Sequence, residues 1–488
     1  MKTVIEAIAH YAATEPDKLA IATGTDEIAY GPFYEEIKGF AACLKERGIK
    51  EGDRIVVKAA QKIWYLVTYY AANLVHAVFV PVEKNVPQLG LQDIAESFDA
   101  VLIISDQDPE QGIPFLASSE VRELALSHEP GNFTEADFPD ENLDSDIWFT
   151  TGTTGKSKGV LLTHAKIYLA AVVGRDRTHV EHDNVYLMAT PLNHAGGIRK
   201  LQSTMTAGAT MVLLDNLTRL KEYFRLFDKY HVTSLALPPT ALHMMISIAG
   251  DELAARADQV RFVYSDSAAL PEVDKENIAK LLPNSCFYNA YGSSEGGSVS
   301  MLEYHKYKGK PSCVGTLNPG VKIKFIDENG EEFKATPEHP GRIASWSEMN
   351  MVCYVNEPEL TAEALKDGWL YTNDLAYMDE DGFIFVTGRA GDVISIGGLK
   401  VAPTEVENCA LRIEDIVECA LTTMDGPNDA KVLRLLVVMR DGAEFKPQEI
   451  QKFLRQYLEN YKIPKAIEQI DAVPRTANGK LDRKKLPK

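Results

Sequence analysis

Short apolar runs of strand length alternate with helical patterns through the first half of the chain. Phe33, Ile37, Phe40 and Leu44 follow the spacing of an amphipathic helix, which Gly48 ends. A second helix is expected near 91–97, and strand-like runs lie at 54–58, 77–82, 101–104, 209–214, 234–237 and 262–264. Strands that alternate with helices are typical of parallel pairing. We therefore expect an α/β fold with a large N-terminal region of αβ-layered subdomains.

The pattern changes after about residue 315, where short strand-like runs alternate with turns. Runs at 321–326 and 383–386 adjoin acidic, glycine-containing turns at 327–330 and 379–382, which predicts a small β-barrel-like subdomain. The last hundred residues mix strand runs at 416–423 and 432–439 with a helical pattern from Ile450 to Leu458. Thr404 and Glu407 form a capping-box pattern that opens a helix there.

The length of 488 residues predicts about three domains at roughly 150 residues each. Gly391 lies between the region of short strands and turns and the C-terminal region of mixed strands and helices. Glycine is conformationally permissive, so a boundary here is plausible. We expect an N-terminal domain at 1–388, a hinge at 389–391 and a small α+β domain at 392–488.

Charge and cysteine usage narrow the partners and the compartment. Lys and Arg number 51 against 70 Asp and Glu, a net charge of −19, which argues against nucleic acid or an anionic membrane surface as a partner. A small anionic ligand in a locally basic pocket stays possible. The six cysteines are scattered and show no zinc-site spacing, so we expect no disulfide framework, no structural metal and a cytoplasmic location.

Residues 63–82 contain no charged side chain and are the one segment that could suggest a membrane span. Thr68, Asn73, His76 and Pro81 interrupt it, which favours a buried helix running into a strand. The N-terminus has no long apolar region typical of a signal peptide.

The segment from Thr150 to Gly159 carries the densest chemistry in the chain. Three glycines allow backbone N–H groups to converge on a ligand, while hydroxyls and two lysines add donors and charge, which suits a polyphosphate. A Walker A loop is excluded because Thr150 stands where its first glycine is required. The alternative is an ordinary flexible loop, which the strand-like flanks make less attractive.

Further motifs follow this loop in a fixed order. They are Tyr291–Glu295, Gly368–Asp374, Gly388–Arg389, Ile394–Glu405 and Pro474–Lys480. Each alone reads as a turn with a structural glycine. Together they closely resemble the adenylate-forming superfamily of acyl- and aryl-CoA synthetases, peptide-synthetase adenylation domains and beetle luciferases, over nearly the whole chain. That superfamily makes an acyl-adenylate from a carboxylate and MgATP, releases pyrophosphate, and usually transfers the acyl group to a thiol.

The resemblance assigns the nucleotide site. It implies that the loop after Thr150 cradles the phosphates, that Tyr291 stacks on adenine, and that Asp374 accepts the ribose hydroxyls. The ATP- and AMP-binding residues it implies are Thr150, Thr151, Gly152, Thr153, Thr154, Gly155, Lys158, Ser267, Ala268, Ala269, Asn289, Ala290, Tyr291, Gly292, Ser293, Asp374, Val386 and Arg389.

The same resemblance implies the catalytic groups. Lys480 would bridge the attacking carboxylate and the α-phosphate, although basic residues follow it and a solvated tail lysine is the alternative. Ser294 would contact the α-phosphate, and Glu295 with Thr151 would hold Mg²⁺. The C-terminal domain would be a mobile lid that brings Gly397, Gly398 and Leu399 to a coenzyme A tunnel.

Pro191–Ile198 resembles the acyl-site motif of the superfamily. His194 would stand at the carboxylate entrance, and Asn193, Gly196, Gly197 and Ile198 would line the pocket. Several positions depart from the pattern. Ser157 replaces a proline, Ser294 a threonine and Ser267 a glycine, and Gly391 stands where Asp or Lys is usual at the hinge.

These residues lead to one expected function. The resemblance implies an ATP-dependent carboxylate–CoA ligase. We expect its acid to be polar or aromatic, because Arg199, Asp266 and Asn289 lie near the predicted pocket. The alternative makes the same adenylate and loads a free-standing acyl carrier protein or an amine; a nucleotide-binding scaffold without catalysis is the least favoured reading. ATP, Mg²⁺ and coenzyme A are the expected cofactors and co-substrates, and the chain is expected to be a monomer or homodimer.

Overall fold

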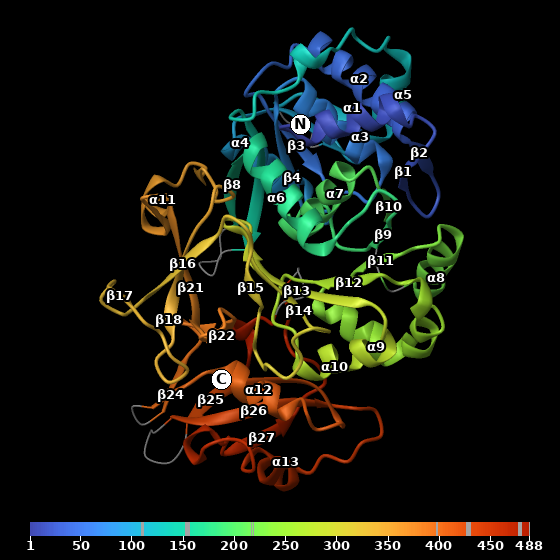
Figure 1. Ribbon diagram of the computed structural model, residues 1–488. Coiled ribbons are helices and arrows are strands. Elements are labelled where there is room, and N and C mark those ends of the chain that lie inside the picture. Colours follow the sequence, from blue (N-terminus) through green and yellow to red (C-terminus); the bar gives the residue numbers. More distant parts are fainter. Residues whose placement is uncertain are drawn as a thin grey trace.

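The computed structural model describes residues 1–108, 112–151, 157–215, 217, 219–396, 399–425, 431–476 and 481–487. Figure 1 shows a large N-terminal part followed by a smaller C-terminal part, drawn in orange and red. Helices and strands alternate as expected, and the α/β fold class is confirmed.

The first sheet is built on parallel strands with an antiparallel hairpin at one side. Its order is β19-β8-β7-β4-β3-β5-β6. The strands are β3 (Arg54–Lys58), β4 (Val78–Val82), β5 (Ala100–Ser105), β6 (Phe115–Ala117), β7 (Asp144–Thr151), β8 (Ser157–Thr163) and β19 (Cys353–Tyr354). The strands expected at 54–58, 77–82 and 101–104 are confirmed to within one residue at each end.

The second sheet has the order β15-β14-β13-β12-β11-β9-β10-β1-β2, with parallel pairing from β13 to β1. Its strands are β1 (Leu19–Ala22), β2 (Glu27–Ala29), β9 (Val185–Met188), β10 (Thr210–Leu213), β11 (Ser234–Ala236), β12 (Phe262–Ser265), β13 (Cys286–Ser293), β14 (Gly297–Glu303) and β15 (Thr316–Leu317).

A layer of helices fills the space between these sheets, and further helices cover their outer faces (Figure 1). The inner helices are α1 (Val4–Thr14), α2 (Tyr30–Glu46), α3 (Ile63–Leu74), α5 (Val121–Ser127), α6 (His164–Thr178) and α7 (Ala195–Thr206). The outer helices are α4 (Gln88–Ser97), α8 (Leu220–Lys229), α9 (Pro239–Ala254) and α10 (Glu272–Leu281).

Period-two alternation explains how each strand serves two cores. Ile55 and Val57 face the inner core, while Val56 between them faces the core under α4. Every residue of α3 except Trp64 is buried, which explains why 63–82 carries no charge. The expected buried helix running into a strand is confirmed. No helix in the described part of the chain is long and apolar enough to cross a membrane.

A third, antiparallel sheet forms a half-barrel in the order β17-β16-β18-β21-β20, with β22 paired to β21. Its elements are β16 (Lys322–Ile326), β17 (Glu332–Phe333), β18 (Gly341–Trp346), α11 (Pro358–Ala364), β20 (Leu365–Lys366), β21 (Trp369–Met378) and β22 (Ile384–Arg389). The turns expected at 327–330 and 379–382 connect its strands, so the small barrel-like subdomain is confirmed.

The C-terminal part is a small α+β unit with its own core. Its elements are β23 (Ile394–Ile396), β24 (Leu399–Val401), α12 (Pro403–Ala410), β25 (Ile416–Asp425), β26 (Lys431–Met439), α13 (Pro447–Leu454) and β27 (Ala466–Gln469). The expected strands are present. The helix expected from 450 to 458 ends at Leu454, because the N–H groups of Gln456 and Tyr457 bond three residues back and tighten the last turn.

The capping box expected at Thr404 and Glu407 is wrong. Ala402 occupies the N-cap and Pro403 begins α12, so Thr404 is already inside the first turn. The Thr404 hydroxyl instead donates to the carbonyl of Thr387 on β22, 2.7 Å away. Glu407 bonds within the C-terminal core rather than to its own helix start.

Candidate functional site

Several expected site residues, together with Glu83, gather where parallel strands of both central sheets end. Glu83 follows β4, His194 lies shortly after β9, Asp266 follows β12 and Tyr291 lies near the end of β13. The carboxyl ends of parallel strands are where α/β folds place ligands.

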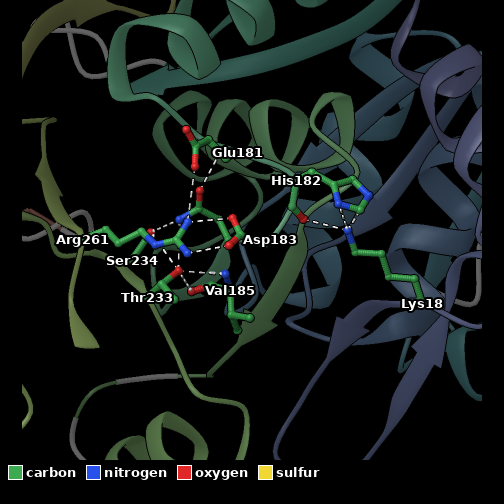
Figure 2. A network of polar contacts seen from close by, with 9 residues as sticks. Lys18, Glu181, His182, Asp183, Val185, Thr233, Ser234 and Arg261 are labelled. Atoms are coloured by element: carbon green, nitrogen blue, oxygen red, sulfur yellow. Dashed lines mark hydrogen bonds and ion pairs between the residues drawn. The ribbon is translucent and has the colours of Figure 1, made fainter. Parts of the chain in front are cut away.

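At the opposite end of the second sheet, a network of polar contacts joins the amino ends of three strands (Figure 2). Arg261 donates to both carboxylate oxygens of Asp183 at 2.7 and 2.6 Å, while the Thr233 hydroxyl accepts from the Val185 N–H at 3.0 Å. These residues precede or begin β9, β11 and β12, so the network closes the amino ends of the strands and leaves the carboxyl ends to the site.

The β7–β8 hairpin holds both ends of the proposed phosphate loop. Thr150 pairs with Lys158 and Thr151 with Ser157. Residues 152–156, the side chains of Thr151 and Leu399, Gly397, Gly398 and Lys480 lie outside the described residues, so their expected roles stay predictions.

A buried carboxyl group anchors the strand that enters this loop. Asp146 accepts hydrogen bonds from the Tyr69 hydroxyl at 2.9 Å, the Trp148 indole at 2.8 Å and the Ser145 hydroxyl at 2.8 Å. Burial raises the pKa of Asp146 to about 7, against the opposing effect of these three donors. In the sequence, Asp146 is marked only as an acidic residue inside an apolar strand.

Asp374 on β21 meets residues from two other motifs. The Tyr291 hydroxyl donates to its Oδ2 at 2.7 Å, and Arg389 Nε donates to its Oδ1 at 2.8 Å. Burial, followed by the charge of Asp374, raises the pKa of Tyr291 well above its ordinary value, so the phenol stays a donor. Val386 packs with Tyr291 against the same small apolar cluster.

Glu295 and Lys158 meet at one aromatic ring. The Tyr354 hydroxyl donates to Glu295 Oε1 at 3.0 Å, and Lys158 Nζ lies 4.9 Å from the centroid of the same ring. Tyr354 thus joins the acidic turn to the end of the phosphate loop. Gly292 is sterically required in this turn, because a methyl group there would lie 2.1 Å from the Gly297 carbonyl oxygen.

The end of β12 is followed by small, solvent-exposed residues. Ser267, Ala268 and Ala269 are exposed, and Ser267 adopts a left-handed φ of 78° that glycine tolerates best. One strand over, the Asn289 amide donates to the Ser265 carbonyl at 3.2 Å.

The proposed acyl-site motif lies at the start of α7. His194 Nε2 lies 3.2 Å from Glu83 Oε1, and the hydrogen bond from His194 lowers the pKa of Glu83 against the effect of burial. Gly197 fits tightly against the Pro191 carbonyl, where a methyl group would lie 2.1 Å away. Ile198 is buried in the core between the sheets.

Glu83 was missed in the sequence, although its place directly after a buried strand is a usable signal. Arg199 donates to the carbonyls of Ser293 and Ser294 at 2.9 and 3.1 Å, and its guanidinium lies 5.2 Å from the Trp148 ring centroid. Arg199 therefore links α7 to the Ser293–Glu295 turn.

Two family models match the sequence of the chain. The model of the AMP-binding enzyme covers residues 8–355, and that of its C-terminal domain covers 405–480. The chain belongs to the AMP-binding enzyme family. It is an AMP-forming ligase of the acyl-CoA synthetase type. The resemblance to the adenylate-forming superfamily is confirmed.

Relatives within the family act on different acids and acceptors. A long-chain-fatty-acid–CoA ligase of Bacillus subtilis is 27% identical over 99% of this chain and 94% of its own. A feruloyl-CoA synthase of an Amycolatopsis species is 28% identical over 96% and 95%. A fatty acid–[acyl-carrier-protein] ligase, ScoC, of Streptomyces coeruleorubidus is 27% identical over 100% and 96%.

Solved structures of the family share the fold. The anthranilate CoA ligase AuaEII in complex with anthranoyl-AMP superposes with a TM-score of 0.90 at 17% identity, covering 99% of this chain and 96% of that one. The o-succinylbenzoate CoA synthetase of Bacillus subtilis with its acyl-adenylate gives a TM-score of 0.86 at 20% identity, covering 99% and 98%.

Proposed function

We propose that the protein joins a polar or aromatic carboxylic acid to coenzyme A through an acyl-adenylate. The carboxylate attacks the α-phosphate of ATP and pyrophosphate leaves; the thiol of coenzyme A then attacks the acyl carbon and AMP leaves. The observation that carries the proposal is the meeting of Tyr291, Asp374 and Arg389, which come from three separate motifs.

The Asp374 carboxylate is oriented for ribose by its two donors. A carboxylate has about four lone-pair sites, and Tyr291 and Arg389 use one on each oxygen. The remaining sites suit two neighbouring hydroxyl groups. The Tyr291 ring would lie against adenine while its hydroxyl keeps the carboxylate in place.

The opposite end of ATP would meet Lys158, Ser294 and Glu295. The Lys158 ammonium at the loop end would offset phosphate charge. Mg²⁺ usually binds through one or two carboxylates plus substrate phosphates, and Glu295 fits this because Tyr354 occupies only one of its oxygens. The ion would neutralise charge on the phosphates. Glu295 would hold it, and Thr151 stays the second expected ligand.

The acid would enter past His194, with Asn193, Gly196 and Gly197 around it. Lys480 would stabilise charge that develops as the carboxylate oxygen reaches the α-phosphate. We further propose that 392–488 acts as a mobile lid about a hinge at 389–391, and that Gly397, Gly398 and Leu399 then line the path of coenzyme A. A cytoplasmic location and a monomer or homodimer stay predictions from the sequence.

A carrier protein is the second candidate acceptor. ScoC, which matches over the whole chain, is a ligase for an acyl carrier protein. An amine acceptor would also be compatible with the nucleotide site.

ATP–pyrophosphate exchange over a panel of acids tests the adenylation step. We expect exchange with at least one polar or aromatic acid. Adding coenzyme A should then yield the acyl-CoA thioester and release AMP. Coenzyme A, carrier protein and amine are then supplied separately. Turnover only with a carrier or an amine would replace the proposed acceptor, exchange fastest with palmitate would overturn the acid class, and ATP binding without any exchange would overturn the function.

A further inference from the structure

A buried ion pair stands against the wall of the proposed acyl pocket. Lys200 on α7 and Asp266 after β12 lie 2.9 Å apart, with side chains only 6% and 17% exposed. A methyl group at Gly196 would lie 3.4 Å from Asp266 Oδ1 and 3.0 Å from Ser267 Oγ. The pair is therefore adjacent to the glycine that the acyl-site motif supplies.

The ammonium of this pair has its hydrogen-bonding capacity filled from within. Lys200 Nζ donates to the Gly196 carbonyl at 2.6 Å and to Asp266 Oδ2 at 2.9 Å. It also lies 4.7 Å from the centroid of the Tyr264 ring. An ammonium has three N–H groups, so Lys200 has little left to offer a ligand.

The carboxylate of the pair keeps unused acceptor sites. Lys200 donates to Oδ2, and the Ser267 hydroxyl donates to Oδ1 at 2.9 Å. About two of the four lone-pair sites remain, on the more exposed member of the pair. The Asp266 carboxylate is therefore a hydrogen-bond acceptor in the pocket wall beside Gly196.

The charges around the pair favour a neutral donor. Arg199 lies next to Lys200 on α7, and the structure gives it no carboxylate partner within ion-pair distance among the described residues. A ligand ammonium at Asp266 would thus lie beside the Lys200 ammonium, which already pairs with that carboxylate. If the acid carried a second carboxylate, that group would face the acceptor oxygens of Asp266 and would find no free donor on Lys200.

The position also limits length. Lys200 Nζ reaches back to the Gly196 carbonyl at 2.6 Å, so the ion pair lies beside the first turn of α7. A compact acid reaches this far, whereas a long alkyl chain would have to pass a buried ion pair.

Resting on the proposed function, we propose that Asp266, held by Lys200, selects a compact acid that carries a neutral hydrogen-bond donor, a hydroxyl or an aromatic amine, on the part remote from its carboxyl group. An unpaired buried acceptor penalises an analogue that lacks the donor, so discrimination exceeds what a methyl-sized difference in an apolar pocket allows.

The test compares matched acids in ATP–pyrophosphate exchange. Hydroxy-, amino-, methyl- and carboxy-substituted benzoates and cinnamates are used, together with short hydroxyalkanoates and their methyl analogues. We expect the best acid to carry a hydroxyl or aromatic amine, and its methyl analogue to lose at least roughly 10²-fold in kcat/KM. A best acid without a donor, or a methyl analogue of equal kcat/KM, would overturn the inference while leaving the ligase function intact. Absence of exchange with every acid would instead count against the proposed function.

Two variants locate the discrimination at the pair. The double variant Lys200→Met with Asp266→Asn removes both charges of the pair. Gly196→Ala places a methyl group against Asp266 and leaves both charges in place. Each variant is expected to reduce the preference for the hydroxyl-bearing acid over its methyl analogue at least tenfold. The control is Lys275→Met with Glu272→Gln, a pair on α10 of similar exposure (3% and 18%) and a distance of 2.8 Å. Undiminished preference in folded Gly196→Ala would show that Asp266 is not the selecting group, even if the double variant failed to fold.

Discussion

Tyr291 and Asp374 set the first prediction at the scale of single residues. Tyr291→Phe keeps the ring but removes the hydroxyl that donates to Asp374 Oδ2. A hydrogen bond contributes about 0.5–1.5 kcal/mol, so we expect KM for ATP to rise roughly 3- to 10-fold while kcat changes little. Steady-state kinetics with saturating acid measures this.

The control is Tyr371→Phe, on the same strand as Asp374, because the Tyr371 ring lies near Lys324 and Lys366 instead. A fall in kcat without a change in KM for ATP would mean that the Tyr291 hydroxyl acts in the chemical step rather than in holding Asp374.

Asp146 makes stability depend on pH. Its pKa is about 7 in the folded chain against an ordinary value of 3.8. The contribution of this raised pKa to stability is therefore complete below about pH 4 and is lost as the pH rises through about 7, by about 4 kcal/mol.

Asp146→Asn removes the titration, so its stability relative to the wild type should rise between pH 4 and pH 7 and then level off. Denaturant unfolding of both proteins across this range gives the difference. Parallel profiles would show that Asp146 ionises in the folded protein as it does in the unfolded chain.

At the scale of elements, the C-terminal part depends on one carboxylate. Glu407 Oε1 accepts from the Leu421 N–H at 2.7 Å and from Arg483 at 2.8 Å, and Oε2 accepts the second Arg483 nitrogen at 2.8 Å. These bonds join α12, β25 and the segment that follows Lys480.

Glu407→Gln leaves a partly buried guanidinium facing an amide donor, which should cost about 2–3 kcal/mol. Thermal unfolding of the full chain is the measurement, with Lys485→Gln as an exposed control (71%). We also expect slower adenylation, since the segment that carries Lys480 loses its anchor. An unchanged melting temperature would contradict this account of the C-terminal core.

Elements that consist of one continuous run of apolar residues could be predicted from the sequence. Arg54–Lys58 is a strand at its predicted limits, because every second residue faces a different core. Helix α12 could not be predicted in detail, because Thr404 and Glu407 satisfy a capping rule yet bond to partners distant in the sequence.

The same limit applies to the site. The glycine- and hydroxyl-rich motifs could be recognised because backbone geometry requires those residue types locally. Glu83, Tyr354 and Lys200 acquire their partners only through tertiary packing, between segments 59 to 111 residues apart. Nothing in their local sequence names those partners.

At the scale of the whole molecule, charge divides at the proposed hinge. Residues 392–488 carry 16 basic and 15 acidic side chains, so the acidic excess of the chain lies in 1–391. The proposed lid is nearly neutral, so it would approach ATP without the repulsion that a segment as acidic as 1–391 would exert on a polyanion.

Restricting the hinge should separate the half-reactions. A methyl group at Gly391 meets no atom within 4 Å, so Gly391→Ala should behave like the wild type. Gly391→Pro fixes φ and restricts the residue before it. We expect it to keep one half-reaction and lose at least tenfold in the other, with exchange and thioester formation assayed separately. Equal rates in both for Gly391→Pro would contradict a pivot at 389–391.

Lys480 offers the most direct test that the chain forms an adenylate with a lysine delivered by the lid. The measurement compares ATP–pyrophosphate exchange with thioester formation from pre-made acyl-adenylate, in the wild type and in Lys480→Ala. Loss of a transition-state charge stabiliser predicts a fall of roughly 10²–10³-fold in exchange, while thioester formation is largely retained. Wild-type exchange, or an equal loss in both half-reactions, would contradict the account.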